Sequence, residues 1–327
     1  MKPRRILVLQ PAFLGDVVFA SPLTRALSEG FPGAELAVLV RPPAEAIARH
    51  LPGVGKVICY DKLGAARGIR GLRAAGRAVK AFAPDLVVSL HASPRTAVLA
   101  MLSGAPERLG PAEGLAAGCY TRTLRLAGLP YARRATTLAE ALGLSASCAL
   151  ELRLPAPLLE WGRCAVPPRA VAVVAGSEWE TKRWPIEHAA ALALELRARG
   201  FSPVLLGSPS ERALCAALNR LAGGSCLDLC GNPVQEALAI LSACSAAVGG
   251  DSGLLHAARA LGIGNVLLFG PTSAAAHLAG PRDRFLSLAL ACSPCSAHGS
   301  RRCPLDHHRC LRDLGPDRVL RVLQELS

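Results

Sequence analysis

The sequence predicts an α/β protein built from two doubly wound, Rossmann-like domains that face each other across a cleft. Short apolar, β-branched segments alternate with longer segments rich in alanine and leucine, and the alternation restarts after a proline-containing stretch. This spacing is typical of βαβ units and therefore of parallel sheets. At 327 residues with 51% hydrophobic content, the chain is long enough for two such domains with buried cores.

The first half begins with an expected strand at residues 5–10. Its apolar run is too short for a signal peptide and leads into Gly15 and Asp16. The other expected strands are 34–40, 56–60 and 85–90. Helices are expected to alternate with the strands, at 17–29, 44–50, 63–82 and 94–102. Together these segments predict a parallel sheet covered by helices.

The regular pattern fades between residues 145 and 168, where four prolines flank Trp161. We place the linker there, between a first domain (1–155) and a second domain (156–327) whose final helix is expected to pack back towards the first. Strands are then expected at 170–174, 203–206, 227–229, 246–248 and 265–269, with helices at 186–199, 210–221, 234–244 and 253–261.

The chain is strongly basic, with a formal charge of +13 and a pI near 9.6. That charge predicts an anionic partner. Nucleic acid is disfavoured, because no basic tract is interleaved with aromatic residues and aromatic content is only 4%. With no export signal and no apolar stretch of transmembrane length, we expect a cytoplasmic location and free thiols among the twelve cysteines.

Ligands of open parallel sheets bind beyond the carboxyl ends of the strands, so the loops that follow strands are the places to search. The first expected strand is followed by Gly15 and Asp16, and Asp16 stands where a carboxylate facing the cleft is expected. The alternative is that Asp16 caps the next helix, since aspartate is a favoured capping residue.

The loop at 175–185 offers backbone amides, the hydroxyl of Ser177, and adjacent cations at Lys182 and Arg183. These groups suit a diphosphate. Only five lysines occur in the chain, which makes Lys182 at a strand end notable. The alternative is that both cations are solvated and Pro185 merely opens a helix.

A glycine-rich turn leads from Gly249 through Asp251, Ser252 and Gly253 into a helix. The amides at such a helix start can bind phosphate. Asp251 or Ser252 could instead cap the helix, and His256 is more typical of a core residue.

A further loop after a strand contains Ser208, Ser210 and Glu211. Glu211 is a candidate acceptor of hydrogen bonds from a ribose diol. The alternative is first-turn chemistry of a helix, in which the acidic side chain stabilises the helix start.

Several motifs are absent or ambiguous. No G-x-G-x-x-G follows an expected strand and no Walker A sequence occurs, which argues against a nicotinamide dehydrogenase and a P-loop enzyme. Near the end, Cys292, Cys295, Cys303 and Cys310 have a spacing that could bind a structural zinc. Cysteine is common throughout this chain, so free thiols remain the alternative.

Taken together, these loops resemble glycosyltransferase family 9, the bacterial ADP-heptose:lipopolysaccharide heptosyltransferases of the GT-B fold, over nearly the whole chain. The motifs that carry the resemblance, closest to the heptosyltransferase II group, are residues 14–18, 182–185, 249–258, 269–273 and 303–310. The segment at 175–180 departs from the family's common P-G-A-E-F-G sequence.

The resemblance implies metal-independent, inverting transfer of heptose from ADP-heptose to the inner core of lipopolysaccharide. The first domain (1–155) would bind the acceptor, and the second (156–327) would bind the nucleotide sugar. Asp16 would be the base, Lys182 the diphosphate contact, and Asp251, Ser252 and Gly253 contacts to sugar and phosphate. The partners would be a phosphorylated Kdo-lipid A or heptosylated core acceptor and the anionic inner leaflet, with peripheral attachment. A different nucleotide sugar, or a catalytically silent protein of the same fold, are the alternatives.

Overall fold

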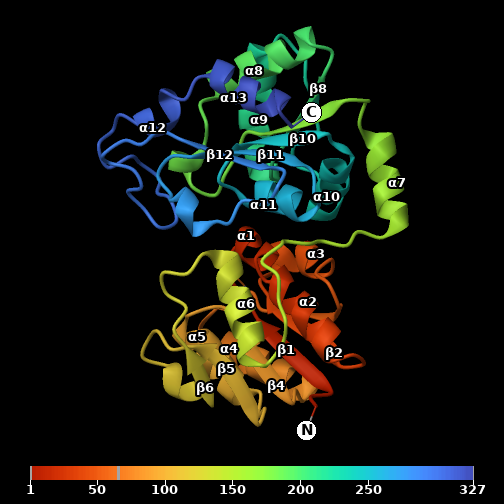
Figure 1. Ribbon diagram of the computed structural model, residues 1–327, viewed down its shortest axis with the longest axis vertical. Helices are drawn as coiled ribbons and strands as arrows, with labels where there is room; N and C mark the ends of the chain where they lie inside the picture. The colour runs from red at the N-terminus through yellow and green to blue at the C-terminus, as the bar shows by residue number, and fades with distance from the viewer. Residues whose placement is uncertain (1, 65–66, 327) are drawn as a thin grey trace. The chain divides into compact units, whose positions relative to one another are not determined.

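The structure is a computed structural model that describes residues 2–64 and 67–326. It divides into two compact units, residues 1–153 and 154–327, each containing one six-stranded sheet (Figure 1). All strand pairs within both sheets are parallel. Among the described residues, no helix combines the length and the apolar character needed to cross a membrane.

In the first unit, the sheet runs in the order β3-β2-β1-β4-β5-β6. Its strands are β1 (Arg5–Leu9), β2 (Glu35–Val40), β3 (Val54–Cys59), β4 (Leu86–Ser89), β5 (Glu107–Pro111) and β6 (Arg122–Leu124). The helices are α1 (Leu14–Val18), α2 (Ser21–Gly30), α3 (Glu45–Ala48), α4 (Gly68–Phe82), α5 (Pro94–Leu102) and α6 (Tyr131–Ala141), with 3-10 turns η1 (Pro42–Ala44) and η2 (Ala117–Cys119).

In the second unit, the sheet runs in the order β12-β11-β10-β7-β8-β9. Its strands are β7 (Ala170–Val174), β8 (Ser202–Leu206), β9 (Leu227–Asp228), β10 (Ala246–Gly250), β11 (Gly264–Phe269) and β12 (Asp283–Ser287). The helices are α7 (Ala156–Ala165), α8 (Ile186–Ala198), α9 (Arg212–Leu221), α10 (Val234–Ala243), α11 (Gly253–Ala260), α12 (Arg309–Arg312) and α13 (Pro316–Gln324), with 3-10 turns η3 (Glu180–Lys182), η4 (Pro209–Glu211) and η5 (Ala274–Ala276). Counted from its own first strand, each sheet has the doubly wound order 3-2-1-4-5-6.

Both faces of each sheet are buried, which explains why the strands are continuously apolar. In β1, Ile6 and Val8 point to one face while Leu7 and Leu9 point to the other, and all four are at most 1% exposed. Leu7 and Leu9 belong to a core that includes side chains of α4 and α5. Burying each such side chain contributes about 1.5–3 kcal/mol.

In the second unit, the corresponding core joins β7 to α8, α9 and α13. Helix α13 packs against α8 and β11 of its own unit, and α8 and α13 lie side by side in Figure 1. Trp184 anchors the loop that precedes α8, because its indole nitrogen donates to the carbonyl of Leu314 at 2.9 Å. The residues between β7 and α8 are therefore tied to the core.

The structure departs from the expected elements at several places. The single helix expected at 17–29 is two helices, because Pro22 lies in the first turn of α2 and cannot continue the hydrogen bonding of a preceding helix. The helix expected at 63–82 begins at Gly68, and residues 65 and 66 of that range lie outside the described residues.

The expected irregular linker contains α7, which packs against α10; Pro157 stands at the start of α7, a position that favours proline. Five further helices and strands were not predicted: β5, β6, α6, β12 and α12. The final helix was expected without bounds, and it is α13.

Candidate active site

The loops that follow β7, β8 and β10 meet at one edge of the second sheet. Strand order reverses between β7 and β10, so this edge is the switch point where ligands of doubly wound sheets bind. Ser177 Oγ donates to the carbonyl of Asp251 at 3.4 Å, and Lys182 Nζ lies 2.6 Å from Asp251 Oδ2. The structure thus brings together side chains that the sequence places about 70 residues apart.

Asp251 is the centre of a buried polar network. Its Oδ2 accepts a hydrogen bond from Thr272 Oγ1 at 2.9 Å in addition to the Lys182 ammonium. Its Oδ1 lies 2.9 Å from Nε2 of His256, and the ring of His256 stacks on that of His277 with centroids 4.8 Å apart. Both oxygens are therefore occupied, and Asp251 is held in one orientation.

Burial opposes ionisation of Asp251, but the hydrogen bond from His256 and the charge of Lys182 outweigh it, and its pKa lies below the usual range. Burial lowers the pKa of His256 and thus favours the neutral ring, against the charge of Asp251, which favours the imidazolium. Ligand-type atoms of Asp251, His256 and His277 all lie within 4.8 Å of one another. We assign no metal to them, because Lys182 and Thr272 already hold the carboxylate.

Two glycines allow the backbone of this site to close up. A Cβ added at Gly250 would lie 2.0 Å from the carbonyl oxygen of Lys182, and one at Gly249 would lie 2.4 Å from that of Val174. Any side chain at Gly250 would push the Lys182 segment away from β10. The glycines in this turn thus have a packing role in addition to flexibility.

The start of α11 presents unused donors. Ser252 is the N-cap of α11 but makes no capping hydrogen bond, and its buried Oγ has no partner within the described part of the chain. The first-turn amides of a helix have no acceptor within that helix, and the positive end of its dipole lies there. Ser252, Gly253 and Leu254 can therefore donate to an anion.

Glu211 follows β8 and closes the same edge of the sheet. Its Oε2 accepts hydrogen bonds from the amide of Ser208 at 2.7 Å and from Ser208 Oγ at 2.8 Å, which forms the capping box of η4. For Oε2, the structure therefore shows the alternative reading, in which the acidic side chain stabilises the start of a helical turn. Glu211 Oε1 lies over Gly176, where an added Cβ would approach it to 1.8 Å, so the carboxylate also borders the Ser177 loop.

Asp16 belongs to the first unit, at the carboxyl edge of β1. It lies in the first turn of α1, and its Oδ2 accepts a hydrogen bond from the amide of Phe13 at 3.1 Å. Lys62 feels the charge of Asp16: burial and the charges of Arg41 and Arg95 lower the pKa of Lys62, and Asp16 opposes them. Arg41 Nε is buried without a hydrogen-bond partner in the described residues.

The C-terminal cysteine segment supports the Lys182 loop. Thr181 Oγ1 donates to the carbonyl of Ser300 at 2.9 Å, and His308 Nε2 lies 2.7 Å from the carbonyl of Thr181. Burial raises the pKa of Cys310 to about 11, and the charges of Cys295, Cys303 and Cys292 add to that effect. In the described residues, however, these thiols do not form a group of three sulfur atoms all within 4.8 Å.

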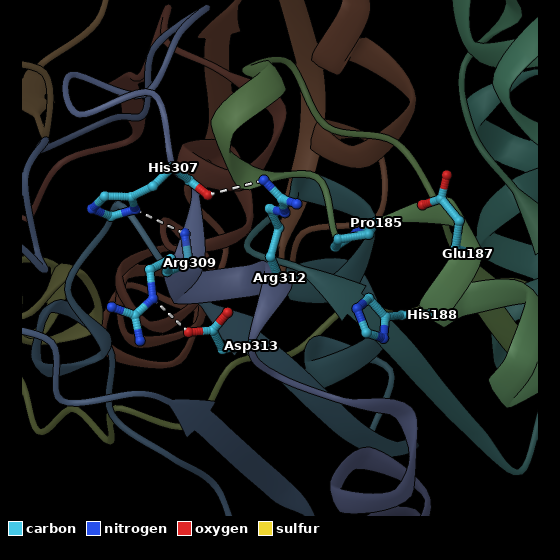
Figure 2. A pocket seen from close by; sticks show the side chains of 7 residues that line it. All are labelled: Pro185, Glu187, His188, His307, Arg309, Arg312 and Asp313. Carbon is cyan, nitrogen blue, oxygen red and sulfur yellow. Dashed lines mark hydrogen bonds and ion pairs between the residues drawn. The ribbon is translucent and has the colours of Figure 1, made fainter.

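A hollow of about 640 Å³ lies beside this segment, at the starts of α8 and α12 (Figure 2). It contains none of the predicted site residues. Arg309 Nε donates to Asp313 Oδ2 at 2.8 Å, and Arg312 lies 3.5 Å from the carbonyl of His307. Because Arg309 pairs with Asp313 and none of the predicted site residues lines the hollow, we do not assign the donor to this pocket. Its lining residues are Pro185, Glu187, His188, His307, Arg309, Arg312 and Asp313.

The comparison with protein families agrees with this geometry. Residues 72–305 match the family described as glycosyltransferase family 9 (heptosyltransferase). The chain belongs to glycosyltransferase family 9. It is therefore a glycosyltransferase, and the resemblance inferred from its loops is confirmed.

Relatives of this family 9 glycosyltransferase are similar along most of its length. Lipopolysaccharide heptosyltransferase 2 of Escherichia coli (strain K12) is 28% identical over 294 residues, covering 82% of this chain and 83% of the relative. The solved structure of E. coli ADP-heptose lps heptosyltransferase II has a TM-score of 0.78 at 25% identity and covers 98% of each chain. The family 9 glycosyl transferase from Veillonella parvula DSM 2008 has a TM-score of 0.86 at 21% identity, covering 99% of this chain and 97% of that one. The predicted GT-B, α/β architecture is thus confirmed.

Three contributors to the site of this family 9 enzyme were not predicted. Thr272 and His277 follow β11, another strand end, so the rule that directed attention to Ser177 and Asp251 would also have found them. His256 was expected to be a core residue, and it is buried, but it also binds Asp251. No local pattern indicates that contact.

Proposed function

We propose that this enzyme transfers heptose from ADP-L-glycero-D-manno-heptose to the inner core of lipopolysaccharide, with inversion and without a catalytic metal, as a heptosyltransferase II-like enzyme. Its family membership and the named activities of its relatives support heptose as the sugar and lipopolysaccharide core as the acceptor. The name of the solved E. coli structure supports ADP as the nucleotide.

The observation that carries the proposal is the edge of the second sheet at β7, β8 and β10. Lys182 and the start of α11 are suited to the diphosphate, since this edge offers an ammonium, first-turn amides and the Ser252 hydroxyl, which has no hydrogen-bond partner among the described residues. In the proposal, Lys182, Ser252 and Gly253 bind phosphate, Asp251 and Ser177 hold the sugar side, and Glu211 accepts hydrogen bonds from the ribose.

The chemistry follows from an inverting displacement. Asp16 accepts the proton of the attacking acceptor hydroxyl, whose oxygen forms a bond to the anomeric carbon. The bond between that carbon and the diphosphate breaks on the opposite face, and its electron pair leaves with ADP. Lys182 and the amides of Ser252 and Gly253 stabilise the charge that develops on the leaving group.

The acceptor and the location follow from charge. The cations near Asp16, including Arg41, Lys62 and Arg95, suit an acceptor that carries phosphate and Kdo carboxylates. A chain with a net charge of +13 is attracted to an anionic inner leaflet, which supports peripheral attachment to the cytoplasmic face of the inner membrane. Binding to anionic vesicles should then weaken as salt rises.

The test is a calorimetric titration with ADP, UDP and GDP, followed by transfer assays with ADP-heptose. Preference for ADP, and heptose transfer to a core that already carries one heptose, are the expected results. Preference for UDP or GDP would overturn the named donor. Transfer only to Kdo-lipid A without heptose would place the enzyme one step earlier in core assembly, and absence of any transfer would favour a silent binding protein.

A further inference from the structure

A second buried ion pair lies directly behind the pair formed by Lys182 and Asp251. Arg259 Nε donates to Asp283 Oδ2 at 2.9 Å, and only 3% and 7% of these side chains are exposed. Arg259 comes from α11, whereas Asp283 comes from the edge strand β12. Burying such a pair has a large desolvation cost, and replacement by apolar residues is often neutral or stabilising. We therefore expect this ion pair to matter for the geometry of the site rather than for the free energy of unfolding.

Arg259 determines where the proton of His256 resides. Arg259 NH1 lies 3.3 Å from His256 Nδ1, and a guanidinium has only donors. Nδ1 must therefore accept, and the single proton of the neutral ring is on Nε2. Since Nε2 lies 2.9 Å from Asp251 Oδ1, it donates to the carboxylate.

Arg259 itself is fixed on several sides. Its NH2 group donates to the carbonyl of Leu278, and its guanidinium lies over the ring of Phe285 at 5.1 Å. Asp283 Oδ2 also accepts from the amide of Gly280 at 2.7 Å. The guanidinium is thus held by the loop at Leu278 and by strand β12, and it cannot turn away from His256 without breaking these contacts.

We propose that Arg259, anchored by Asp283, is a positioning residue of the donor site that keeps His256 neutral with its proton on Nε2, and thereby holds Asp251 in place. The inference rests on the proposed function, in which Lys182 and Asp251 contact the donor. When Lys182 turns towards the diphosphate, Asp251 loses its cation. It retains the hydrogen bonds from His256 and Thr272, so the buried carboxylate keeps its orientation.

The proposal concerns the protonation of His256, so every charged or titratable group that faces it matters. These groups are Lys182 from η3, Asp251 after β10, Arg259 from α11 and His277 after η5, with Asp283 of β12 behind Arg259. Asp251 favours the imidazolium, whereas burial, Arg259 and Lys182 favour the neutral ring. Removing Arg259 should therefore make His256 easier to protonate.

The first experiment uses the full, unaltered chain labelled with ¹⁵N-histidine, and follows the ring nitrogens by NMR. His256→Gln identifies the signal of His256. We expect that ring to remain neutral, with its proton on Nε2, across the ordinary titration range of histidine, about pH 5–8. A ring that titrates within this range, or that carries its proton on Nδ1, overturns the proposal.

The second experiment compares binding of ADP-heptose by calorimetry in Arg259→Met/Asp283→Asn and in the unaltered chain, because Asp251 is assigned to the sugar side of the donor. The double change removes both charges together, and the asparagine keeps an oxygen for the amide of Gly280. We expect Kd for ADP-heptose to rise about tenfold, the loss typical of one hydrogen bond to a charged group. The ratio of the two Kd values should also change with pH where His256 of the double variant titrates, since ionisation of the donor itself cancels in that ratio.

Arg284→Met is the matched control, because Arg284 lies on the same strand with 37% of its side chain exposed. It should leave both Kd and its pH dependence unchanged. If Lys182→Met weakens binding of ADP-heptose but the double variant does not, Arg259 has no positioning role and the donor site stands. If neither change affects binding of ADP-heptose, the proposed donor site itself is wrong.

Discussion

Lys182 Nζ lies 2.6 Å from Asp251 Oδ2, and 14% and 7% of the two side chains are exposed. The site thus neutralises itself when no donor is bound. A diphosphate has to compete with Asp251 for the ammonium, and it can do so because the network from Thr272 and His256 supports the carboxylate independently.

Lys182→Met should weaken ADP binding by roughly 10–100-fold, because a hydrogen bond to a charged group contributes about 1.5–3 kcal/mol. Calorimetric titration with ADP measures this loss. Lys80→Met, at an exposed position of α4, is the matched control and should bind ADP as the unaltered chain does. Equal affinities in the two variants would remove Lys182 from the diphosphate site.

Asp16→Asn should lower transfer by a factor of about 10²–10⁴, since the amide cannot act as a general base. It retains an oxygen that can accept from the amide of Phe13, so the start of α1 should be preserved. ADP affinity should not change. Steady-state kinetics with saturating ADP-heptose tests the prediction, with Glu29→Gln, an exposed acid of α2, as the control. Undiminished turnover of Asp16→Asn would exclude this residue as the base.

Transfer should survive treatment with EDTA, because the proposed mechanism uses a lysine and backbone amides where other enzymes use a cation. An activity that falls with EDTA and returns with a divalent cation would contradict this mechanism.

The zinc site considered at the C-terminal cysteines is a separate question. Because these thiols are not gathered among the described residues, metal analysis of Cys295→Ser/Cys303→Ser should show the same zinc content as the unaltered chain. Zinc that is lost in this variant but kept in the exposed pair Cys59→Ser/Cys164→Ser would contradict the expectation and assign a structural zinc to the C-terminal segment.

His91 should make the first unit sensitive to acid. Burial, aided by the charge of Lys62, lowers the pKa of His91 to about 4 from 6.5. As pH falls, His91 therefore binds a proton in the unfolded chain before it does so in the folded chain. The free energy of unfolding decreases between about pH 6.5 and pH 4 for this reason, and His91 causes no further decrease below about pH 4. The loss attributable to this ring is at most about 3 kcal/mol.

Urea unfolding at several pH values tests this expectation. His91→Asn should reduce the decline between about pH 6.5 and 4, and it can still hydrogen-bond to Thr96, which lies 2.8 Å from Nδ1 of His91. His298→Asn, at an exposed position, is the control and should follow the unaltered chain. Identical pH profiles for the unaltered chain and His91→Asn would contradict the prediction.

Sequence reasoning succeeded where the signal is local. The bounds of β7 and α5 match the expected ranges, because the first is a short buried apolar run and the second opens with proline. The rule that ligands bind beyond strand ends selected Ser177, Lys182, Asp251 and Ser252, which the structure gathers at one edge. The alternative role of Glu211 at a helix start was likewise predictable, because Ser208 stands three residues before it, as in a capping box.

Contacts set by tertiary packing were not predictable in this way. Arg259 stands among alanines near the end of α11, and Asp283 opens an edge strand that the pattern did not reveal. The two residues are 24 positions apart, so no local spacing indicates that they pair. Strands β5, β6 and β12 were missed for a related reason, because they are short edge or near-edge strands with exposed polar positions rather than continuous apolar runs.

The shared strand order of the two sheets has a dynamic consequence. The loops that carry Asp16, Lys182 and Asp251 begin at β1, β7 and β10, each of which has a hydrogen-bonded neighbour on both sides. Local opening in proteins starts at edges and ends, where amides have the fewest partners. Fraying of β3, β6, β9 or β12 therefore does not release these loops, and each can rearrange around a ligand while its point of attachment stays protected from exchange with solvent.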